Sequence, residues 1–543
     1  MSRRTFLKKI AAATAVVPLG GNGLIPAFTP QHNTNKNQIV NESTPQQQLE
    51  NATRQMRARL IADWHRPTYH FVSPEGHDYP FDPNGAIYWK GKYHLGYIYQ
   101  HNDENGERKH WWGHVASHDL FHWHALPPML PLHEHDPEKG IFSGGAFIAK
   151  DGVPHVVYHG VDAGNCIAKA ADDRLEHWEK FQQNPVLPLI KRKSLTEYDE
   201  DNEGNAWDPH IWLEGDTYYQ ISGGNPPGLF KSADLISWTY VGQFMDQRQV
   251  KHQSFEDWSC PDFFKLGDKY VSVAISHNLG SQYYIGDFVD EQFVPHRHGR
   301  MNWPGGTFFA PESMVDDRGR RILFGWVLET RDYEDAHGWS GVMSLPRVLD
   351  IDRAGELTVS PPEEVRSLRY NASSVPDFQL GESEERNLTN LAGNALEVHV
   401  RFTPTDTDGI FGMRVLRSSD GAEFTEIRYE QQKQELVIDF AHSARSGSVQ
   451  YPSYCMMGHL DKRLPEYVSE QRVPFVLEAG ETLFLEIFID KSIVEVFANR
   501  RLCITQRVYP ADQDSTLTQV FSQRARVGVH GVRGWQMAQT NFC

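Results

Sequence analysis

Carboxylates recur at related places in three short segments, and each segment opens a strand-like run of apolar residues. The segments are 81–85 with Asp82, 207–209 with Asp208, and 258–262 with Asp262. Two carboxyl groups that face each other across a sugar are the usual requirement for cleaving a glycosidic bond. The pattern therefore predicts glycosidic bond chemistry. It is irregular at one point, because the third segment has Ser259 where a carboxylate would be most useful.

The three segments begin copies of one repeat, which consists of an apolar strand, a turn containing glycine and a second apolar strand. The turn residues Gly91, Gly215 and Gly267 stand where a tight hairpin favours positive φ. With two looser copies, the repeats start about 50 to 65 residues apart, which fits a four-stranded blade. The repeats predict a five-bladed β-propeller over residues 61–355. An irregular β-sandwich is the alternative, but it would not need repeats that start with equivalent residues.

The repeat pattern stops near Pro361 and Pro362. Beyond it, segments such as 396–402 and 485–497 alternate apolar and polar residues, as half-buried antiparallel strands do. We therefore expect a β-sandwich over residues 375–543. The predicted fold is all-β, with a five-bladed β-propeller followed by a C-terminal β-sandwich.

In a propeller the innermost strands line a central funnel, and alternate residues on each strand point into it. By this alternation four pairs are expected to share a face: Asp82 with Asn84, Asp208 with His210, Cys260 with Asp262, and Ala310 with Glu312. Gathered carboxylates raise the pKa of at least one of them, which a general acid requires and a structural core would avoid. A lone Asp-Pro is better explained as a turn, but two at matching repeat positions favour a site.

With these motifs in place, the chain resembles glycoside hydrolase family 32, the invertase, levanase and inulinase group. The resemblance covers nearly all of the chain after its N-terminal segment. It rests on many short matches in the same order, which include 82–85, 93–95, 99–100, 112–114, 119–120, 142–144, 283–286, 310–311, 319–325, 345–347 and 487–497. The family fold is a five-bladed propeller joined to a β-sandwich, so the resemblance implies the same architecture.

The resemblance also implies a retaining mechanism, in which Asp82 attacks the anomeric carbon of a fructofuranosyl unit and Asp208 stabilises the charged transition state. The residues that would shape the pocket for the terminal sugar are Asn84, Gln100, Trp112, Phe142 and Ser143. Without the resemblance, core packing would explain Trp112 and Phe142 about as well.

Two departures from the family pattern stand in the expected site. Trp207 replaces an arginine, so an aromatic plane takes the place of a charged hydrogen-bond donor. Ser259 replaces the glutamate that is the family's general acid/base, and loss of general acid catalysis costs about 10² to 10⁴-fold in rate. We expect Trp207, Ser259 and Asp262 to contact the substrate in this altered pocket.

Three replacements for the missing acid can be weighed. Glu312 is preferred, because it comes from the next blade and its parity points it into the funnel. Asp262 has suitable parity too, but the family has an aspartate there beside its glutamate, which favours a structural role. Glu256 and Asp257 could reach in if the loop before Ser259 bulges.

The N-terminus has the pattern of an export signal. Arg3 and Arg4 precede a short apolar run, 10–19, which indicates a twin-arginine signal over residues 1–29. Residues 30–60 are rich in Gln, Asn and Thr and are expected to form a solvated linker. No apolar stretch reaches the roughly 18 residues that span a bilayer, so we expect no membrane span. From the twin-arginine pattern we expect export to the periplasm or the medium.

Composition limits the partners. The formal charge is −18, from 53 Lys and Arg against 71 Asp and Glu, which disfavours nucleic acid. The 14 Trp residues suit a protein that stacks on sugar rings. The five cysteines have no metal-ligand or redox spacing. We expect no essential disulfide, metal or cofactor, and the acidic segment 197–203 is better explained as solvated charge than as a calcium site.

The leading hypothesis is an exported retaining glycosidase that acts on fructofuranosides of sucrose or fructan type, or on a related furanoside glycan. A fructosyl transferase would use the same covalent intermediate. A catalytically silent glycan-binding propeller is the alternative from another class. The presence of both Asp82 and Asp208 argues against it, because binding alone does not need two close carboxylates.

Overall fold

In the part of the chain that it describes, the computed structural model shows an all-β protein preceded by the helix α2, Pro45–Ala62. It describes residues 44–73, 82–102, 106–189, 206–248, 250, 256–330, 339, 341–445, 449–453 and 465–541. The chain divides into two units between Arg59 and Leu60, and each is described by itself. No helix among the described residues combines the length and the apolar character that crossing a bilayer requires.

The helix α2, Pro45–Ala62, includes the last part of the predicted solvated linker, residues 30–60. Its sequence is rich in Gln, Arg, Ala and Leu, which are good helix formers. None of its residues is buried, because the sequence has no continuous apolar face. The predicted export signal and the first part of the predicted linker lie outside the described residues.

Five antiparallel sheets follow in chain order. The first sheet contains β1 Pro83–Trp89, β2 Lys92–Asn102, β3 Arg108–Ser117 and β4 Trp123–Ala125, and the second contains β5 Ile141–Ile148, β6 Pro154–Gly160, β7 Gly164–Ala170, β8 Trp178–Lys180 and β9 Leu187–Pro188. The third contains β10 Pro209–Glu214, β11 Thr217–Ser222, β12 Gly228–Ser232 and β13 Thr239–Gln243, and the fourth contains β14 Ser259–Leu266, β15 Lys269–Ser276, β16 Gly280–Val289 and β17 Gln292–Arg300. The fifth contains β18 Phe308–Val315, β19 Arg321–Val327, β20 Arg347–Ile351 and β21 Leu357–Ser360.

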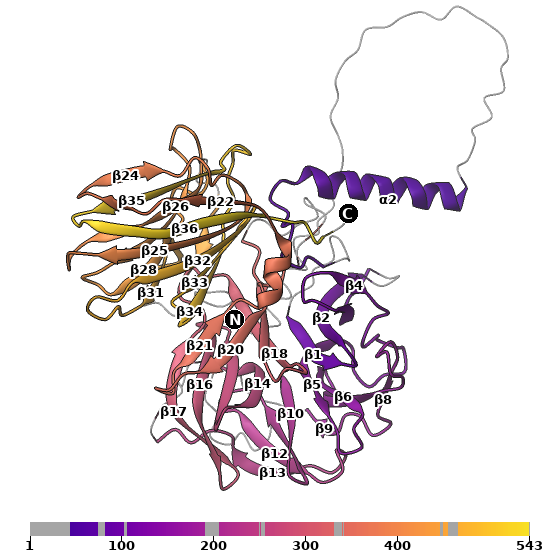
Figure 1. The fold of residues 1–543 in the computed structure, drawn as a ribbon. Coiled ribbons are helices and arrows are strands. Elements are labelled where there is room, and N and C mark those ends of the chain that lie inside the picture. Colours follow the sequence, from indigo (N-terminus) through magenta and orange to yellow (C-terminus); the bar gives the residue numbers. More distant parts are fainter. Residues whose placement is uncertain are drawn as a thin grey trace, which may run out of the picture. The chain divides into compact units, whose positions relative to one another are not determined.

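The first strand of each sheet is the innermost one. β1 contacts β5, β5 contacts β10, β10 contacts β14, β14 contacts β18, and β18 contacts β1, so the five strands form a closed ring at the centre of the lower part of Figure 1. The short last strands, such as β8 and β13, lie at the periphery. This closed arrangement is a β-propeller.

The innermost strands are irregular near their beginnings. The pairing of β1, β5, β14 and β18 with the next strand shifts register between residues 84 and 87, 141 and 144, 259 and 262, and 309 and 312. Cys260 and Ala310 at two of these shifts have positive φ, 45° and 46°. Such bulges re-aim the side chains beside them, and strict alternation therefore fails at these places.

The remaining strands form two packed sheets. The first has the order β22 Arg369–Val375, β36 Val527–Met537, β25 Ala395–Pro404, β32 Leu483–Asp490, β33 Ile493–Ala498 and β34 Leu502–Arg507, with β23 Phe378–Leu380 also on β36. The second has the order β24 Glu384–Asn387, β35 Leu517–Gln523, β26 Ile410–Arg417, β27 Thr425–Glu430, β28 Glu435–Asp439 and β31 Glu470–Pro474. A small sheet pairs β29 Tyr451–Pro452 with β30 Tyr467–Val468.

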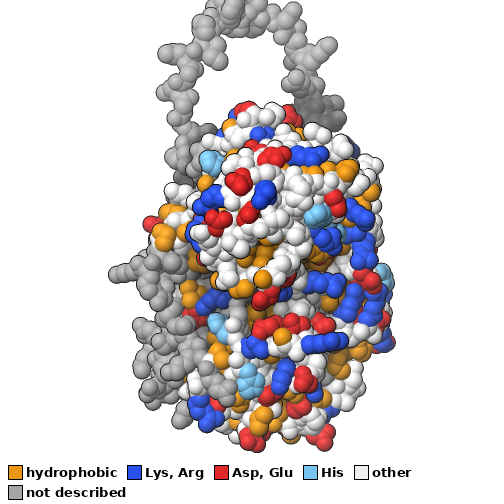
Figure 2. Space-filling view, turned by 60° about the vertical axis from the view of Figure 1, so that its left-hand side comes forward, with side chains coloured by type: hydrophobic (Ala, Val, Ile, Leu, Met, Phe, Trp, Pro, Cys, Tyr) orange, Lys and Arg blue, Asp and Glu red, His pale blue; other side chains and the backbone are white. Residues whose placement is uncertain are grey.

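A single apolar cluster from both large sheets fills the space between them, which makes this part a β-sandwich. A short 3₁₀ helix, Glu363–Leu368, connects it to β21. The predicted fold class, a propeller followed by a C-terminal sandwich, is confirmed. On the face drawn in Figure 2, basic and acidic side chains are interspersed rather than segregated.

Candidate active site

Four residues from four different sheets meet at the beginnings of the innermost strands. Ser143 Oγ donates a hydrogen bond of 2.7 Å to Asp82 Oδ2. Cys260 Sγ lies 3.5 Å from Asp82 Oδ2 and 3.8 Å from Asp208 Oδ2, and the Cys260 backbone N–H donates to the same Asp208 oxygen at 3.1 Å. Cys260 Sγ therefore lies close to both carboxylates, although they are far apart in the sequence.

Backbone geometry explains how this cluster forms. Asp82 and Asp208 immediately precede β1 and β10, so the ring of innermost strands brings both to one end of the propeller. The positive φ of Cys260 directs its N–H toward Asp208. Both aspartates are buried, 4% and 1% exposed. Two close, buried carboxylates have the arrangement that sugar chemistry uses.

The Asn84 side chain holds the backbone at Asp82 in position. Its Nδ2 donates to the Asp82 carbonyl at 2.7 Å, and its Oδ1 accepts from the Gly144 N–H at 2.8 Å. These bonds connect the beginning of β1 to β5. Asn84 thus fixes the backbone that carries the carboxylate.

The predicted aromatic residues lie together beside this cluster. Trp112 has no exposed surface, and its Nε1 donates to the Phe142 carbonyl at 3.0 Å. It therefore acts on the pocket by holding Phe142 in place. Phe142 packs against His110 at 4.8 Å between ring centroids. Gln100, which pairs with His110 across β2 and β3, has a buried Oε1 with no hydrogen-bond partner among the described residues, as expected of a group that awaits a ligand.

The two departures from the family pattern contact each other. Trp207 Nε1 donates to Ser259 Oγ at 2.9 Å, and Ser259 Oγ donates to Asp257 Oδ2 at 2.7 Å. A neutral pair thus occupies the two positions at which we expected a departure from the family pattern. The Trp207 ring also packs on His159, with 4.7 Å between centroids.

Asp257 is shared with a histidine that the sequence did not single out. His277 Nδ1 lies 2.6 Å from Asp257 Oδ2, and the His277 N–H donates to Asp257 Oδ1 at 2.8 Å. Burial alone would raise the pKa of Asp257, but the charge and hydrogen bonds of His277 lower it. Asp257 therefore stays ionised and holds His277. The histidine follows β15, so no local motif joins it to Ser259.

Glu312 occupies a different level of the central channel. Its Oε1 accepts from the Ala86 N–H at 3.4 Å, four residues beyond Asp82, and it lies with Asp262 and His210, whose Nδ1 is 3.5 Å from Asp262 Oδ1. Burial, with repulsion from Asp262, raises the pKa of Glu312 well above its ordinary value. The described contacts do not bring Glu312 to Asp82 or Asp208, because the bulge at Ala310 carries it further along the channel.

Asp262 also lies at this second level. Its Oδ2 accepts a hydrogen bond from Ser313 Oγ, and it is 1% exposed. These contacts join β14 to β18 within the channel. They describe a connection between blades, in line with the structural role that sequence reasoning favoured over an acid role.

Comparison with known proteins identifies the family of the chain. The family description "Glycosyl hydrolases family 32 N-terminal domain" matches residues 70–361, and "Glycosyl hydrolases family 32 C terminal" matches residues 364–536. The chain is 28% identical to a fructan 1-exohydrolase of Bromus pictus, over 85% of each protein. It is 27% identical to a sucrose-6-phosphate hydrolase of Escherichia coli, over 87% of this chain and 94% of that protein.

Solved structures show the same fold. The crystal structure of fructan 1-exohydrolase IIa from Cichorium intybus superposes with a TM-score of 0.73 at 24% identity, over 88% of this chain and 98% of that one. A sucrose-6-phosphate hydrolase from Lactobacillus gasseri gives a TM-score of 0.69 at 21% identity, over 91% of this chain and 97% of that one. The propeller and the sandwich are thus found together in both.

Proposed function

Because the chain belongs to glycosyl hydrolase family 32, we propose that it is a retaining hydrolase of fructofuranosides, of sucrose or fructan type, with Asp82 as its nucleophile. The chain is a glycosidase by family. The observation that carries the finer assignment is the convergence of Asp82 and Asp208 on Cys260 Sγ, at 3.5 and 3.8 Å, from separate innermost strands.

The proposed reaction proceeds in two displacements. Asp82 attacks the anomeric carbon as the bond to the leaving oxygen breaks, which gives a fructosyl ester, and water then releases fructose and restores the carboxylate. The hydrogen bond from Ser143 orients the attacking carboxylate. Asp208 accepts hydrogen bonds from ring hydroxyls, which strengthen as positive charge develops on the sugar.

The proton for the leaving oxygen is assigned to His277 in this proposal. Three observations support it over Glu312. Asp257 contacts Ser259, which stands at the family's acid/base position. Asp257 itself has a lowered pKa and is a poor proton donor, whereas the imidazole that it holds is the residue type that most often serves as a general acid. Glu312 is placed with Asp262 at the other level of the channel.

The test of the nucleophile is release of fructose from sucrose, levan and inulin by the full chain and by Asp82→Asn. We expect the substitution to abolish release, because an amide cannot form the ester intermediate. Asp268→Asn, an exposed aspartate on a hairpin turn, is the matched control and should keep full activity. Binding of these sugars without release by the unaltered protein would instead support the silent glycan-binding alternative.

Hydrolysis and transfer are separated by their products. A hydrolase yields free fructose in step with the leaving sugar, and a transferase yields longer oligosaccharides.

Export is also part of the proposal, supported by Arg3 and Arg4 ahead of the apolar run 10–19. Cell fractionation tests it, since the protein is expected outside the cytoplasm and a purely cytoplasmic location would contradict it.

A further inference from the structure

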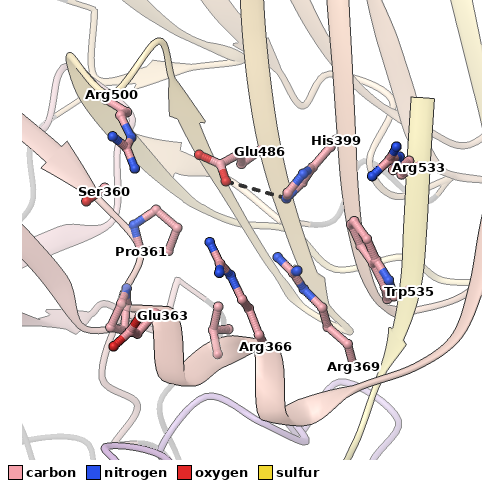
Figure 3. A pocket seen from close by; sticks show the side chains of 12 residues that line it. Ser360, Pro361, Glu363, Arg366, Arg369, His399, Glu486, Arg500, Arg533 and Trp535 are labelled. Atoms are coloured by element: carbon pink, nitrogen blue, oxygen red, sulfur yellow. Dashed lines mark ion pairs between the residues drawn. The ribbon is translucent and has the colours of Figure 1, made fainter. Parts of the chain in front are cut away.

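A second cavity lies away from the innermost strands, where the end of the propeller sequence meets the sandwich. It has a volume of about 410 Å³. One wall comes from β21 and the 3₁₀ helix that follows it, and the other from β25, β32 and β36. Its charged lining consists of Glu363, Arg366, Arg369, His399, Glu486, Arg500 and Arg533 (Figure 3).

Some of these charges are already compensated. Arg369 Nε and Nη2 donate to the buried Glu397 at 2.6 and 2.5 Å, and the same guanidinium stacks on Trp535, 4.2 Å from the ring centroid. His399 Nε2 lies 2.8 Å from Glu397 Oε1 and 3.5 Å from Glu486 Oε1. Glu363, at the edge of the cavity, pairs with Arg318. The acidic groups are therefore engaged.

Three arginines remain over. Arg366, Arg500 and Arg533 are exposed, and their side chains form no hydrogen bond or ion pair with any other described residue. In Figure 3 the guanidinium groups of Arg366, Arg369 and Arg500 lie around the space in front of Glu486, and Arg533 lies at its far side. They come from three separate segments, 366–369, 500 and 533, so the fold, and no run of basic sequence, gathers them.

This surplus is unusual for the molecule. The whole chain has a formal charge of −18, and its charges of both signs are mixed on the face drawn in Figure 2. A concave site with unpaired guanidinium groups attracts and orients oxyanions, because each guanidinium offers a planar fork of N–H donors.

We propose that this cavity is a second ligand site, which binds a sugar carrying a sulfate or phosphate ester. The ester group lies between Arg366 and Arg500, and the sugar ring extends toward Arg533 at the far side of the cavity. This site is independent of the proposed hydrolysis, because none of its residues belongs to the cluster around Asp82.

The experiment is isothermal titration calorimetry on the purified full chain at low salt, with glucose 6-sulfate, glucose 6-phosphate and glucose as probes. These pyranoses are not fructofuranosides, so hydrolysis does not complicate the titration. We expect at least one ester to bind and glucose not to bind. Replacement of Arg366, Arg500 and Arg533 together by serine should weaken ester binding by about tenfold or more. Tighter binding of glucose 6-sulfate would indicate a sulfated sugar as the ligand, and tighter binding of glucose 6-phosphate would indicate a phosphorylated sugar.

The matched control removes the same charge elsewhere, by replacing Arg54, Arg353 and Arg526, which are exposed and outside the cavity. It should change affinity less than about twofold, the small effect of distant screened charge. Absence of ester binding, equal binding of glucose, or an equal loss in the control would overturn the proposal. If the triple variant does not fold, the single change Arg366→Ser is measured instead, with the same expected direction.

Discussion

Trp207 and Ser259, the two residues that we expected to depart from the family pattern, contact each other. The indole N–H and the hydroxyl satisfy each other at 2.9 Å, inside a site where both residues are buried. An isolated charge at either position would be costly, because a buried charge without its partner destabilises a fold by about 3 to 5 kcal/mol. The two positions are therefore expected to change together.

This coupling can be measured at the residue scale with Ser259→Glu, Trp207→Arg and the double variant. Ser259→Glu alone places a carboxylate against the buried Asp257 and should lower the free energy of unfolding by about 3 kcal/mol. The double variant supplies a counter-charge and should recover most of that loss. Urea unfolding of all four proteins gives the coupling energy; strictly additive effects would contradict the argument.

The proton donor is tested by comparing two leaving groups. His277→Asn should reduce hydrolysis of sucrose by about 10² to 10⁴-fold, but should affect 4-nitrophenyl β-fructofuranoside much less, because nitrophenolate departs without a proton. Glu312→Gln is the matched variant and should leave both rates near their original values. Equal losses on both substrates in His277→Asn would show a structural role instead, and a selective loss in Glu312→Gln would return the acid to Glu312.

At the scale of elements, bulges in the innermost strands divide the channel into two levels. Asp82, Ser143, Asp208 and Cys260 form one level, and Glu312 lies with Asp262 in the other. Strands without register shifts would hold all inward residues to a single alternation. The bulges thus separate Asp82 and Asp208 from Asp262 and Glu312.

The second level makes a stability prediction. The pKa of Glu312 is raised by burial and by Asp262, so its contribution to stability is present below its ordinary pKa of 4.5 and is lost as pH rises through the raised value. Glu312→Gln should therefore be more stable than the unaltered protein above neutral pH, with the advantage shrinking toward pH 4. Chemical denaturation at a series of pH values measures this difference, and a constant difference would contradict it.

At the scale of the whole molecule, buried charges join the segment before β1 and the propeller strand β20 to the sandwich. His70 lies 3.0 Å from Asp490 and 3.1 Å from Glu495, with all three side chains inaccessible, and Arg347 donates to Glu495 at 2.9 Å. Burial alone would lower the pKa of His70, but its two carboxylate partners raise it to about 9. Burial would likewise raise the pKa of Glu495, but His70 and Arg347 lower it to about 2.

These shifts predict how stability depends on pH. The His70 contribution is present below its ordinary pKa of 6.5 and is lost as pH rises through about 9. The Glu495 contribution is present above 4.5 and is lost as pH falls through about 2. Replacement of His70 by Gln should flatten the alkaline loss of unfolding free energy, and replacement of the exposed His135 should not. Urea denaturation between pH 6 and pH 10 checks this, and an unchanged slope in the His70 variant would refute it.

Several features could be predicted from the sequence because they repeat or alternate. Equivalent positions in a repeat occupy equivalent positions in a closed ring, so Asp82 and Asp208 had to lie at the same end of the propeller. Alternation of apolar and polar residues specifies half-buried strands wherever it occurs, which is why the sandwich was predictable. The helix over 45–62 could not be predicted in this way, because it depends on the helix propensity of its residues and no apolar periodicity marks it.

Other features depend on tertiary structure, because their partners are distant in sequence and their directions depend on local backbone angles. The Trp207–Ser259 contact, the hold of Asp257 on His277 and the surplus of arginines at the sandwich each join segments with no shared motif. The depth of Glu312 was set by a positive φ at Ala310, which no side-chain pattern encodes. The sequence by itself thus determined the fold and the meeting of two aspartates, and only packing between blades and domains decided which groups stand beside them.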